Sequence, residues 1–588
     1  MLIVAKHRRR ARSFAQCPSQ IVRVLTGAVM LTLVVACTSQ SSSSYSSRPN
    51  AEGQSPGALK RVVAAVQSNP PTLNSRVGST VGGSQPGVDA IEELLNVGMS
   101  TPDAHGVLQA RLAEEVPTVE NGHWIVTSDG RMETTWTIRP NAQWHDGVPV
   151  TADDMVFTVQ VGQDREIPVF RDPTYDIVES VDALDARTVR VRWSGPYIRA
   201  DSMFSRAIAL PLPKHILADP YTYDRAGFLD LSYWSGEFIG TGAFRVKEFE
   251  RGASLTVSAN DAYVLGRPKI DEIEIRFIPD NAAVVANLLA DSVEVTLGRS
   301  LSLEQGVNLR DQWRDGTVDI ASQSWMALYP QLLTPHPAII GEAAFRRALL
   351  DGIDRQEMAD TLEFGMVPVA HVYVSPQDAE FNEILPSVVK YEYDPRSAKQ
   401  RLSQLGFETG ADGSYRDAAG TALGVQIQVT SSLEAQVKSA FSVADYWQKL
   451  GIGVGVDVVP PQRATDAEYR ATFSGFALVR QPNDVDAITR AHSRTTPLPE
   501  NNFTGLNRTR YRNPEFDAQI DSYTTTIPFA DRMRVLGQIV HFMTDQVLWM
   551  GLFYETEPTA IAKRLKNVTA RSQKSVQTWN AHDWDVSS

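Results

Sequence analysis

Cysteine is scarce in this chain, which has only Cys17 and Cys37 in 588 residues. Both lie near the N-terminus, ahead of every predicted strand and helix, so no disulfide can link parts of the folded body. The chain is also too long for one ordinary hydrophobic core. With 43% hydrophobic and 21% charged residues, it is predicted to fold into two or three globular domains.

Basic charge is in short supply as well, with 56 Lys and Arg residues against 69 Asp and Glu and a formal net charge of −13. The mature part of the sequence has no basic stripe, which argues against nucleic-acid binding. A net negative charge of this size is typical of a secreted protein, in which the charge maintains solubility. The alternative interpretation is that the negative charge attracts cationic ligands.

Motifs for covalent chemistry and for metal binding are missing. The sequence has no Gly-x-Ser-x-Gly, no His-Glu-x-x-His and no paired-cysteine motif. The ten histidines are scattered singly, without the spacing of a metal cluster. His145-Asp146 could be taken for half of a catalytic dyad, but no Ser or Cys lies in a nucleophile motif. We therefore predict that the protein is not an enzyme and that it holds neither a cofactor nor a resident metal ion. Binding of nickel stays an open alternative that no sequence feature supports.

A hydrophobic run long enough to span a membrane is also lacking. The apolar stretch at residues 24–36 is too short for a transmembrane helix, and it follows a basic segment at residues 6–12. Residues 1–36 are therefore predicted to be a signal peptide. The stretch ends in LVVAC, whose cysteine is Cys37, and residues 38–57 form a Ser-rich segment typical of a flexible spacer.

The ending LVVAC resembles the lipobox of bacterial lipoproteins, in which the cysteine sulfur receives a diacylglyceryl group and becomes the new N-terminus. The resemblance implies that Cys37 is lipidated and that residues 37–57 tether the folded body. The protein would then be exported and held at the outer face of the cell membrane, or at the periplasm-facing membrane of a Gram-negative cell. The alternative is a core cysteine in a short membrane anchor.

Strand-like and helical patterns alternate over the rest of the chain. Short β-branched runs bounded by Asp, Gly, Pro or Asn predict strands at 60–66, 134–139, 188–193, 254–258, 273–278, 425–430 and 453–459. Apolar periodicity and end signals predict helices at 152–161, 281–289, 343–364, 397–406, 433–451 and 531–546. This mixture predicts an α/β or α+β class with more than one sheet.

Five segments in order resemble the family 5 extracellular solute-binding proteins, which serve peptide, opine and nickel ABC transporters. They carry the family's "HDG" turn and helix start, its "P-K-H-I" stretch, a Gly-Thr-Gly turn, a "VRQAL" helix and a C-terminal pattern. In this chain they lie at 136–157, 212–217, 240–280, 345–355 and 502–580. Gly240-Thr241-Gly242 itself is interpreted as a tight turn before a strand, because it lacks the rest of a phosphate loop.

The resemblance implies a two-lobed periplasmic-binding-protein fold (type II, cluster C-like) that encloses a ligand as the lobes close. Lobe I would take residues 58–97, 200–323 and 545–588, a small domain 98–199, and lobe II 324–544. A monomer is expected that captures a peptide or peptide-like solute and passes it to ABC transporter permease subunits. The alternatives are a non-peptide solute such as an oligosaccharide, opine or metal chelate, an envelope interaction or signalling lipoprotein, and a secreted hydrolase.

One departure from the family pattern concerns the residue that holds the ligand. Residues 475–486 resemble the segment in which an Asp pairs with the α-amino group of a peptide. An ungapped count places Arg480 at that position, whereas a small shift would place Asp484 or Asp486 there. An Arg would favour a carboxylate or phosphate through bidentate hydrogen bonds. The alternative for all three residues is that they are solvated loop charges.

A second departure lies before the "VRQAL"-like helix, where the family has an Asn that lines the cleft. Here Gln331 is the nearest amide, and Pro330 removes a backbone donor. Trp325 and Tyr329 are candidates for amphipathic contacts with the ligand, and a core position for either is the alternative.

Overall fold

The computed structural model describes residues 59–82, 85–431 and 434–587. The predicted signal peptide, Cys37 and the spacer lie outside this part of the chain. No helix within these ranges is long and apolar enough to cross a membrane.

Buried apolar side chains form two separate cores. The first core is built from residues between 62 and 318 and between 560 and 584. The second is built from residues between 325 and 554. We call the parts of the chain around these cores lobe I and lobe II.

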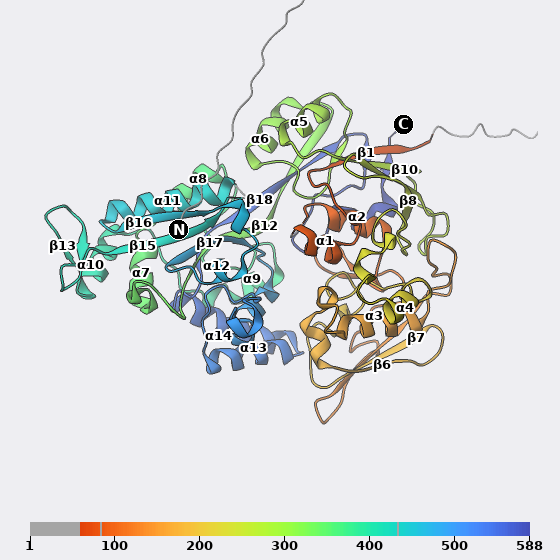
Figure 1. The fold of residues 1–588 in the computed structure, drawn as a ribbon, viewed down its shortest axis with the longest axis horizontal. Helices are drawn as coiled ribbons and strands as arrows, with labels where there is room; N and C mark the ends of the chain where they lie inside the picture. Colours follow the sequence, from red (N-terminus) through yellow and green to blue (C-terminus); the bar gives the residue numbers. More distant parts are fainter. Residues whose placement is uncertain (1–58, 83–84, 432–433, 588) are drawn as a thin grey trace, which may run out of the picture. The chain divides into compact units, whose positions relative to one another are not determined.

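Two long antiparallel strands connect the cores, and Figure 1 shows them in the middle of the molecule. They are β12 (Gly316–Pro330) and β18 (Met550–Ala562), paired from Gly316 opposite Ala562 to Leu328 opposite Met550. Each strand begins in one core and ends in the other. Buried apolar residues between 547 and 554 belong to the second core, and β18 continues unbroken from the second core into the first. The expected start of the last lobe I segment at 545 stays a prediction.

One ten-stranded sheet runs through both lobes in the order β16-β15-β17-β12-β18-β11-β1-β10-β9-β8. The pairs of β1 with β10 and β11, and of β15 with β16 and β17, are parallel, and the other pairs are antiparallel. The remaining strands are β1 (Arg61–Val66), β8 (Phe244–Glu250), β9 (Ser254–Ala259), β10 (Glu272–Phe277), β11 (Val295–Thr296), β15 (Gly424–Thr430), β16 (Gly453–Val459) and β17 (Phe476–Gln481).

A smaller antiparallel sheet has the order β4-β5-β7-β6 and contributes to the first core. Its strands are β4 (Trp124–Val126), β5 (Met132–Thr137), β6 (Val178–Ala183) and β7 (Thr188–Trp193). In β7, buried and half-buried positions alternate, as expected of a sheet with one face on the core. This sheet falls inside the predicted small domain, whose boundaries stay a prediction.

Three further strand pairs in the described part of the chain are short. They are β2 (Ser100–Pro102) with β3 (Leu108–Ala110), β13 (Glu408–Thr409) with β14 (Tyr415–Arg416), and β19 (Leu565–Lys566) with β20 (Asp585–Val586). The helices of lobe I are α1 (Ser75–Gly82), α2 (Val88–Leu95), α3 (Ala152–Gln163), α4 (Lys214–Tyr223), α5 (Asn281–Leu289) and α6 (Leu303–Gln312).

The helices of lobe II include one that differs from its prediction. The pattern at 343–364 forms two helices, α7 (Ala343–Asp351) and α8 (Arg355–Leu362), because the side chain of Asp354 accepts a hydrogen bond from the backbone of Glu357 and starts a new helix. The others are α9 (Ala379–Ile384), α10 (Pro395–Gln404), α11 (Glu434–Leu450), α12 (Ala467–Ala471), α13 (Pro514–Thr525) and α14 (Phe529–Asp545).

The "HDG" and Gly-Thr-Gly turns hold each other in lobe I. The backbone N–H of His145 donates to Gly240 O at 2.9 Å, and Gly240 N–H donates to His145 Nδ1 at 3.2 Å. His145 Nε2 lies 3.1 Å from Gly242 O, so the ring donates from Nε2. Burial lowers the pKa of His145 to about 4, which keeps the ring neutral. This histidine is therefore a structural clamp between two turns.

Candidate functional site

Polar side chains from the two lobes meet beside the connecting strands. Gln573 Nε2 of lobe I donates a hydrogen bond to Asp378 Oδ1 of lobe II, and Lys574 Nζ lies 3.3 Å from Asp378 Oδ2. Arg199 Nε of lobe I lies 3.5 Å from Asp486 Oδ2 of lobe II. We call these residues, together with Asn483, the inter-lobe site.

Two loops of lobe II present its share of this site. The backbone N–H of Ser375 donates to Asn483 O at 3.0 Å, which brings the loop before α9 against the loop after β17. Asp378 follows at the start of α9. Asp486 lies in the first turn of a 3-10 helix (Val485–Ala491) that Asp484 precedes. Local turn structure therefore sets where these carboxylates lie.

The side chain of Asn483 is fully buried, with 0% exposure. Neither its Oδ1 nor its Nδ2 has a hydrogen-bond partner among the described residues. A buried amide without a partner costs roughly 1–3 kcal/mol by protein mutational data, so such groups are rare in folded proteins. The carboxamide of Asn483 is therefore a candidate for a hydrogen bond that the described residues do not supply.

Carboxylates of the inter-lobe site are shifted toward their neutral forms. Burial raises the pKa of Asp378 to about 6, and Lys574 acts in the opposite direction. Burial also raises the pKa of Asp486, which Arg199 lowers and the neighbouring Asp484 raises again. Each charge at this site faces a charge of opposite sign from the other lobe.

Arg480 lies on β17 and reaches across β12 to carboxylates on β18. Its guanidinium pairs with both Glu555 and Glu557. Glu557 Oε1 also lies 2.7 Å from Arg299 Nε of lobe I, and Ser324 Oγ donates to Glu555 Oε2 at 2.7 Å. We call Arg299, Arg480, Glu555 and Glu557 the ion cluster. The positive charge of Arg480 is thus already balanced, and its predicted contact with a solute stays a prediction.

Trp325, Tyr329 and Gln331 lie inside lobe II. Trp325 and Tyr329 are 2% and 3% exposed, and both rings pack against Trp549 in the second core. Gln331 Nε2 donates to Ala471 O at 3.2 Å and to Phe473 O at 3.1 Å. A role for these three side chains in solute binding stays a prediction.

Sequence reasoning missed most of the inter-lobe site. Asn483 lies within the segment 475–486 that resembles the family, but an amide there carried no pattern of its own. Arg199, Asp378 and Lys574 are separated by more than 170 residues from one to the next, so no spacing in the chain connects them. Within the described ranges, no group of three or more His, Cys, Asp or Glu side chains could hold a metal ion.

Two cores joined by two strands, with opposed polar groups between them, define the architecture of a two-lobed binding protein. The family model for bacterial extracellular solute-binding proteins, family 5 (middle), matches residues 108–512, and the chain belongs to this family. It is therefore an extracytoplasmic solute-binding protein and not an enzyme, as the sequence predicted.

Individual relatives agree with this assignment. The oligopeptide-binding protein AppA of Bacillus subtilis is 24% identical over 573 residues, which is 95% of this chain and 98% of that protein. The structure of AppA with a nonapeptide has a TM-score of 0.71 at 20% identity, covering 90% of this chain and 100% of AppA. NikZ from Campylobacter jejuni in complex with Ni(L-His) has a TM-score of 0.72 at 20% identity, covering 89% and 99%. The structural likeness confirms the predicted mixed α/β, two-lobed fold.

Proposed function

We propose that this protein captures a peptide or peptide-like solute at the inter-lobe site and delivers it to the permease of an ABC transporter. The observation that carries the proposal is the buried, unpaired carboxamide of Asn483. A carboxamide can donate to a peptide C=O and accept from a peptide N–H, so it matches a peptide bond in both directions. The relatives named for oligopeptide binding support this choice of solute.

The connecting strands are the natural place for the lobes to open and close. The pairing of β12 with β18 is irregular between Ser322 and Ser324, beside the inter-lobe site. A break in the ladder lets a strand bend locally. In the proposal, bending at this point closes Arg199, Gln573 and Lys574 of lobe I onto Asp378 and Asp486 of lobe II, around the solute.

A non-peptide solute is the second candidate. The neighbour NikZ was solved with Ni(L-His), and the inter-lobe site offers cationic groups on lobe I and anionic groups on lobe II. Such a site also suits a zwitterionic chelate or an opine. Native mass spectrometry of the protein purified without refolding identifies the bound mass directly, and a chelate or opine there would replace the peptide in the proposal.

Replacing Asn483 by Leu tests the proposed site. We expect Asn483→Leu to leave the ligand-free protein as stable as the wild type, or to stabilise it by about 1 kcal/mol or more, because an unpaired buried amide is removed. We expect the same change to weaken binding of a defined peptide pool about tenfold or more, since one hydrogen-bonding group is lost. Thermal unfolding with and without the pool measures both effects.

Asn382→Leu on the exposed surface of α9 is the matched control, because it makes the same chemical change at an exposed position that is not one of the residues of the inter-lobe site. Asn382→Leu should change neither the stability of the ligand-free protein nor its affinity for the peptide pool. Peptide stabilisation that is equal in wild type and Asn483→Leu would rule out this residue as a solute contact. A wild-type protein that no peptide pool stabilises, and that carries no peptide, would rule out the peptide solute.

The attachment of the protein to the membrane is a separate proposal. We infer that Cys37 carries a lipid that holds the monomeric protein at the outer face of the cell membrane, since LVVAC and a Ser-rich spacer precede the folded body. Cys37→Ser should move the protein from the membrane fraction to the soluble extracytoplasmic fraction. Metabolic labelling with a palmitate analogue should mark the wild type and not the variant, and labelling of both would contradict the assignment.

A further inference from the structure

A cavity of about 570 Å³ lies against the connecting strands, lined by residues of both lobes. Its size falls within the range of sites for small organic molecules. Val318, Ile320 and Ser322 of β12 form one wall, and Arg310 at the end of α6 lies at one end. Met366 to Pro368 and Gln377 of lobe II complete the lining. Its lining contains none of the residues that define the inter-lobe site.

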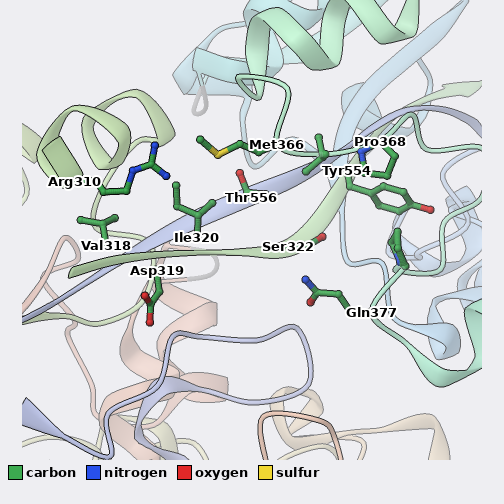
Figure 2. A pocket seen from close by; sticks show the side chains of 12 residues that line it. Arg310, Val318, Asp319, Ile320, Ser322, Met366, Pro368, Gln377, Tyr554 and Thr556 are labelled. Atoms are coloured by element: carbon green, nitrogen blue, oxygen red, sulfur yellow. The ribbon is translucent and has the colours of Figure 1, made fainter.

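Apolar side chains line one part of the cavity, beside polar ones such as Thr556 and Gln377. Figure 2 shows Val318, Ile320 and Met366 on one side of β12, whereas Asp319 points to the other side. Val367 and Tyr554 add further buried apolar surface. A ligand with an aliphatic or aromatic body would therefore lose contact with water where it lies against these apolar side chains, which favours binding.

A cationic group lies at one end of this wall. Arg310 is exposed, and Figure 2 shows its guanidinium on the same side of β12 as Met366. Arg310 forms no ion pair or side-chain hydrogen bond with any of the residues that the structure describes. A guanidinium in this position can bind a carboxylate or phosphate through two parallel hydrogen bonds.

A hydroxyl group lies farther along the same wall. Ser322 is 8% exposed, and its Oγ has no hydrogen-bond partner in the described part of the chain. A buried hydroxyl without a partner is unfavourable, so it marks a position for a donor or acceptor of a ligand. Ser322 lies four residues beyond Val318, which corresponds to about 13 Å along an extended strand.

We propose that this cavity is a second binding site, for an elongated organic anion whose charged end pairs with Arg310. The apolar body lies along Val318 and Ile320, and a hydrogen-bonding group at the far end reaches Ser322. The ligand touches both lobes and the strand that joins them, so it would couple this site to the movement of the lobes. The proposal is independent of which solute occupies the inter-lobe site.

The test uses 10-hydroxydecanoate and decanoate as probes in isothermal titration calorimetry with the full mature protein. We expect Arg310→Gln to weaken the binding of both probes about tenfold, because a charge-assisted hydrogen bond is lost. Arg314→Gln is the matched control, since Arg314 is an exposed arginine just beyond α6 that does not line the cavity. It should leave both affinities unchanged.

Ser322→Val tests the far end of the ligand. The wild type should bind 10-hydroxydecanoate several-fold more tightly than decanoate, and Ser322→Val should remove this preference while keeping the affinity for decanoate. Equal affinities in wild type and Arg310→Gln would overturn the proposal, as would the absence of measurable binding to the wild type. Loss of binding in Asn483→Leu would place the probes at the inter-lobe site and would also overturn it.

Discussion

Arg480→Met is expected to lower the free energy of unfolding by about 3–5 kcal/mol, the range for removing one partner of a buried ion pair. Arg480 is the cation that lies between Glu555 and Glu557, and the side chains of all three are at most 15% exposed. Without it, Arg299 is the cation left in the ion cluster, and it contacts Glu557 and not Glu555. Urea denaturation of both proteins at neutral pH measures the difference.

Two further variants make this expectation specific. Arg490→Met is the matched control, because Arg490 is half-buried and its side chain donates a hydrogen bond to the amide oxygen of Gln481 and, among the described residues, to no carboxylate. Arg490→Met should lower the free energy of unfolding by about 1 kcal/mol, the usual value for a single hydrogen bond. Combining Arg480→Met with Glu555→Gln should recover most of the lost stability, since Glu555 is the carboxylate left without a cation, whereas Glu557 keeps its ion pair with Arg299.

The same variant separates two roles of Arg480. An arginine that mainly holds the ion cluster should lose stability when it is replaced, whereas an arginine that mainly binds a solute carboxylate should lose affinity at nearly unchanged stability. A cost for Arg480→Met no larger than that of Arg490→Met, with a large loss of solute affinity, would favour the binding role that the sequence suggested.

The elements that the sequence predicts well are those whose signals are local. The helix at 281–289 has the predicted bounds, because Asp280 accepts a hydrogen bond from Ala283 N at its first turn. The strand at 188–193 also has the predicted bounds, since alternating side chains face the core. Gly451 ends α11 with a φ of 104°, a conformation that glycine adopts without strain.

The parts that could not be predicted depend on distant residues. Nothing local to Arg480 indicates Glu555 and Glu557, which lie more than 70 residues away and meet it because β12 holds β17 and β18 at fixed register. The segment FYETEP of β18 has three consecutive polar residues, Glu555 to Glu557, a pattern that is typical of an exposed strand. The two glutamates can be buried because the arginines of the ion cluster balance their negative charges. Since Arg299 belongs to lobe I and Arg480 to lobe II, this balance exists only once both lobes have folded.

The second prediction with a large effect concerns Glu363, at the end of α8, and the pH dependence of stability. Its side chain is 3% exposed, and it accepts hydrogen bonds from the backbone N–H and Oγ1 of Thr556. Burial raises the pKa of Glu363 from 4.5 to about 8, and the nearby charge of Glu555 raises it further in the same direction. The folded protein therefore holds a proton on Glu363 at neutral pH that the unfolded chain releases.

The sign of the pH dependence follows from this proton. Below pH 4.5 both states are protonated at Glu363, so the group does not change the stability. As the pH rises from 4.5 to about 8 the unfolded chain loses the proton first, and the free energy of unfolding falls. The loss is complete above the folded pKa and is on the order of 5 kcal/mol, since each pKa unit corresponds to about 1.4 kcal/mol.

Glu363→Gln should remove this loss, because the amide oxygen can accept the same two hydrogen bonds from Thr556 and does not titrate. We expect wild type and variant to be about equally stable at pH 4.5 in urea denaturation, and the variant to be more stable by several kcal/mol at pH 8.5. Glu383→Gln on the exposed side of α9 is the control and should follow the wild type at both values. Parallel pH profiles for wild type and Glu363→Gln would mean that Glu363 is ionised in the folded protein, balanced by the cation of Arg480 that the first prediction removes.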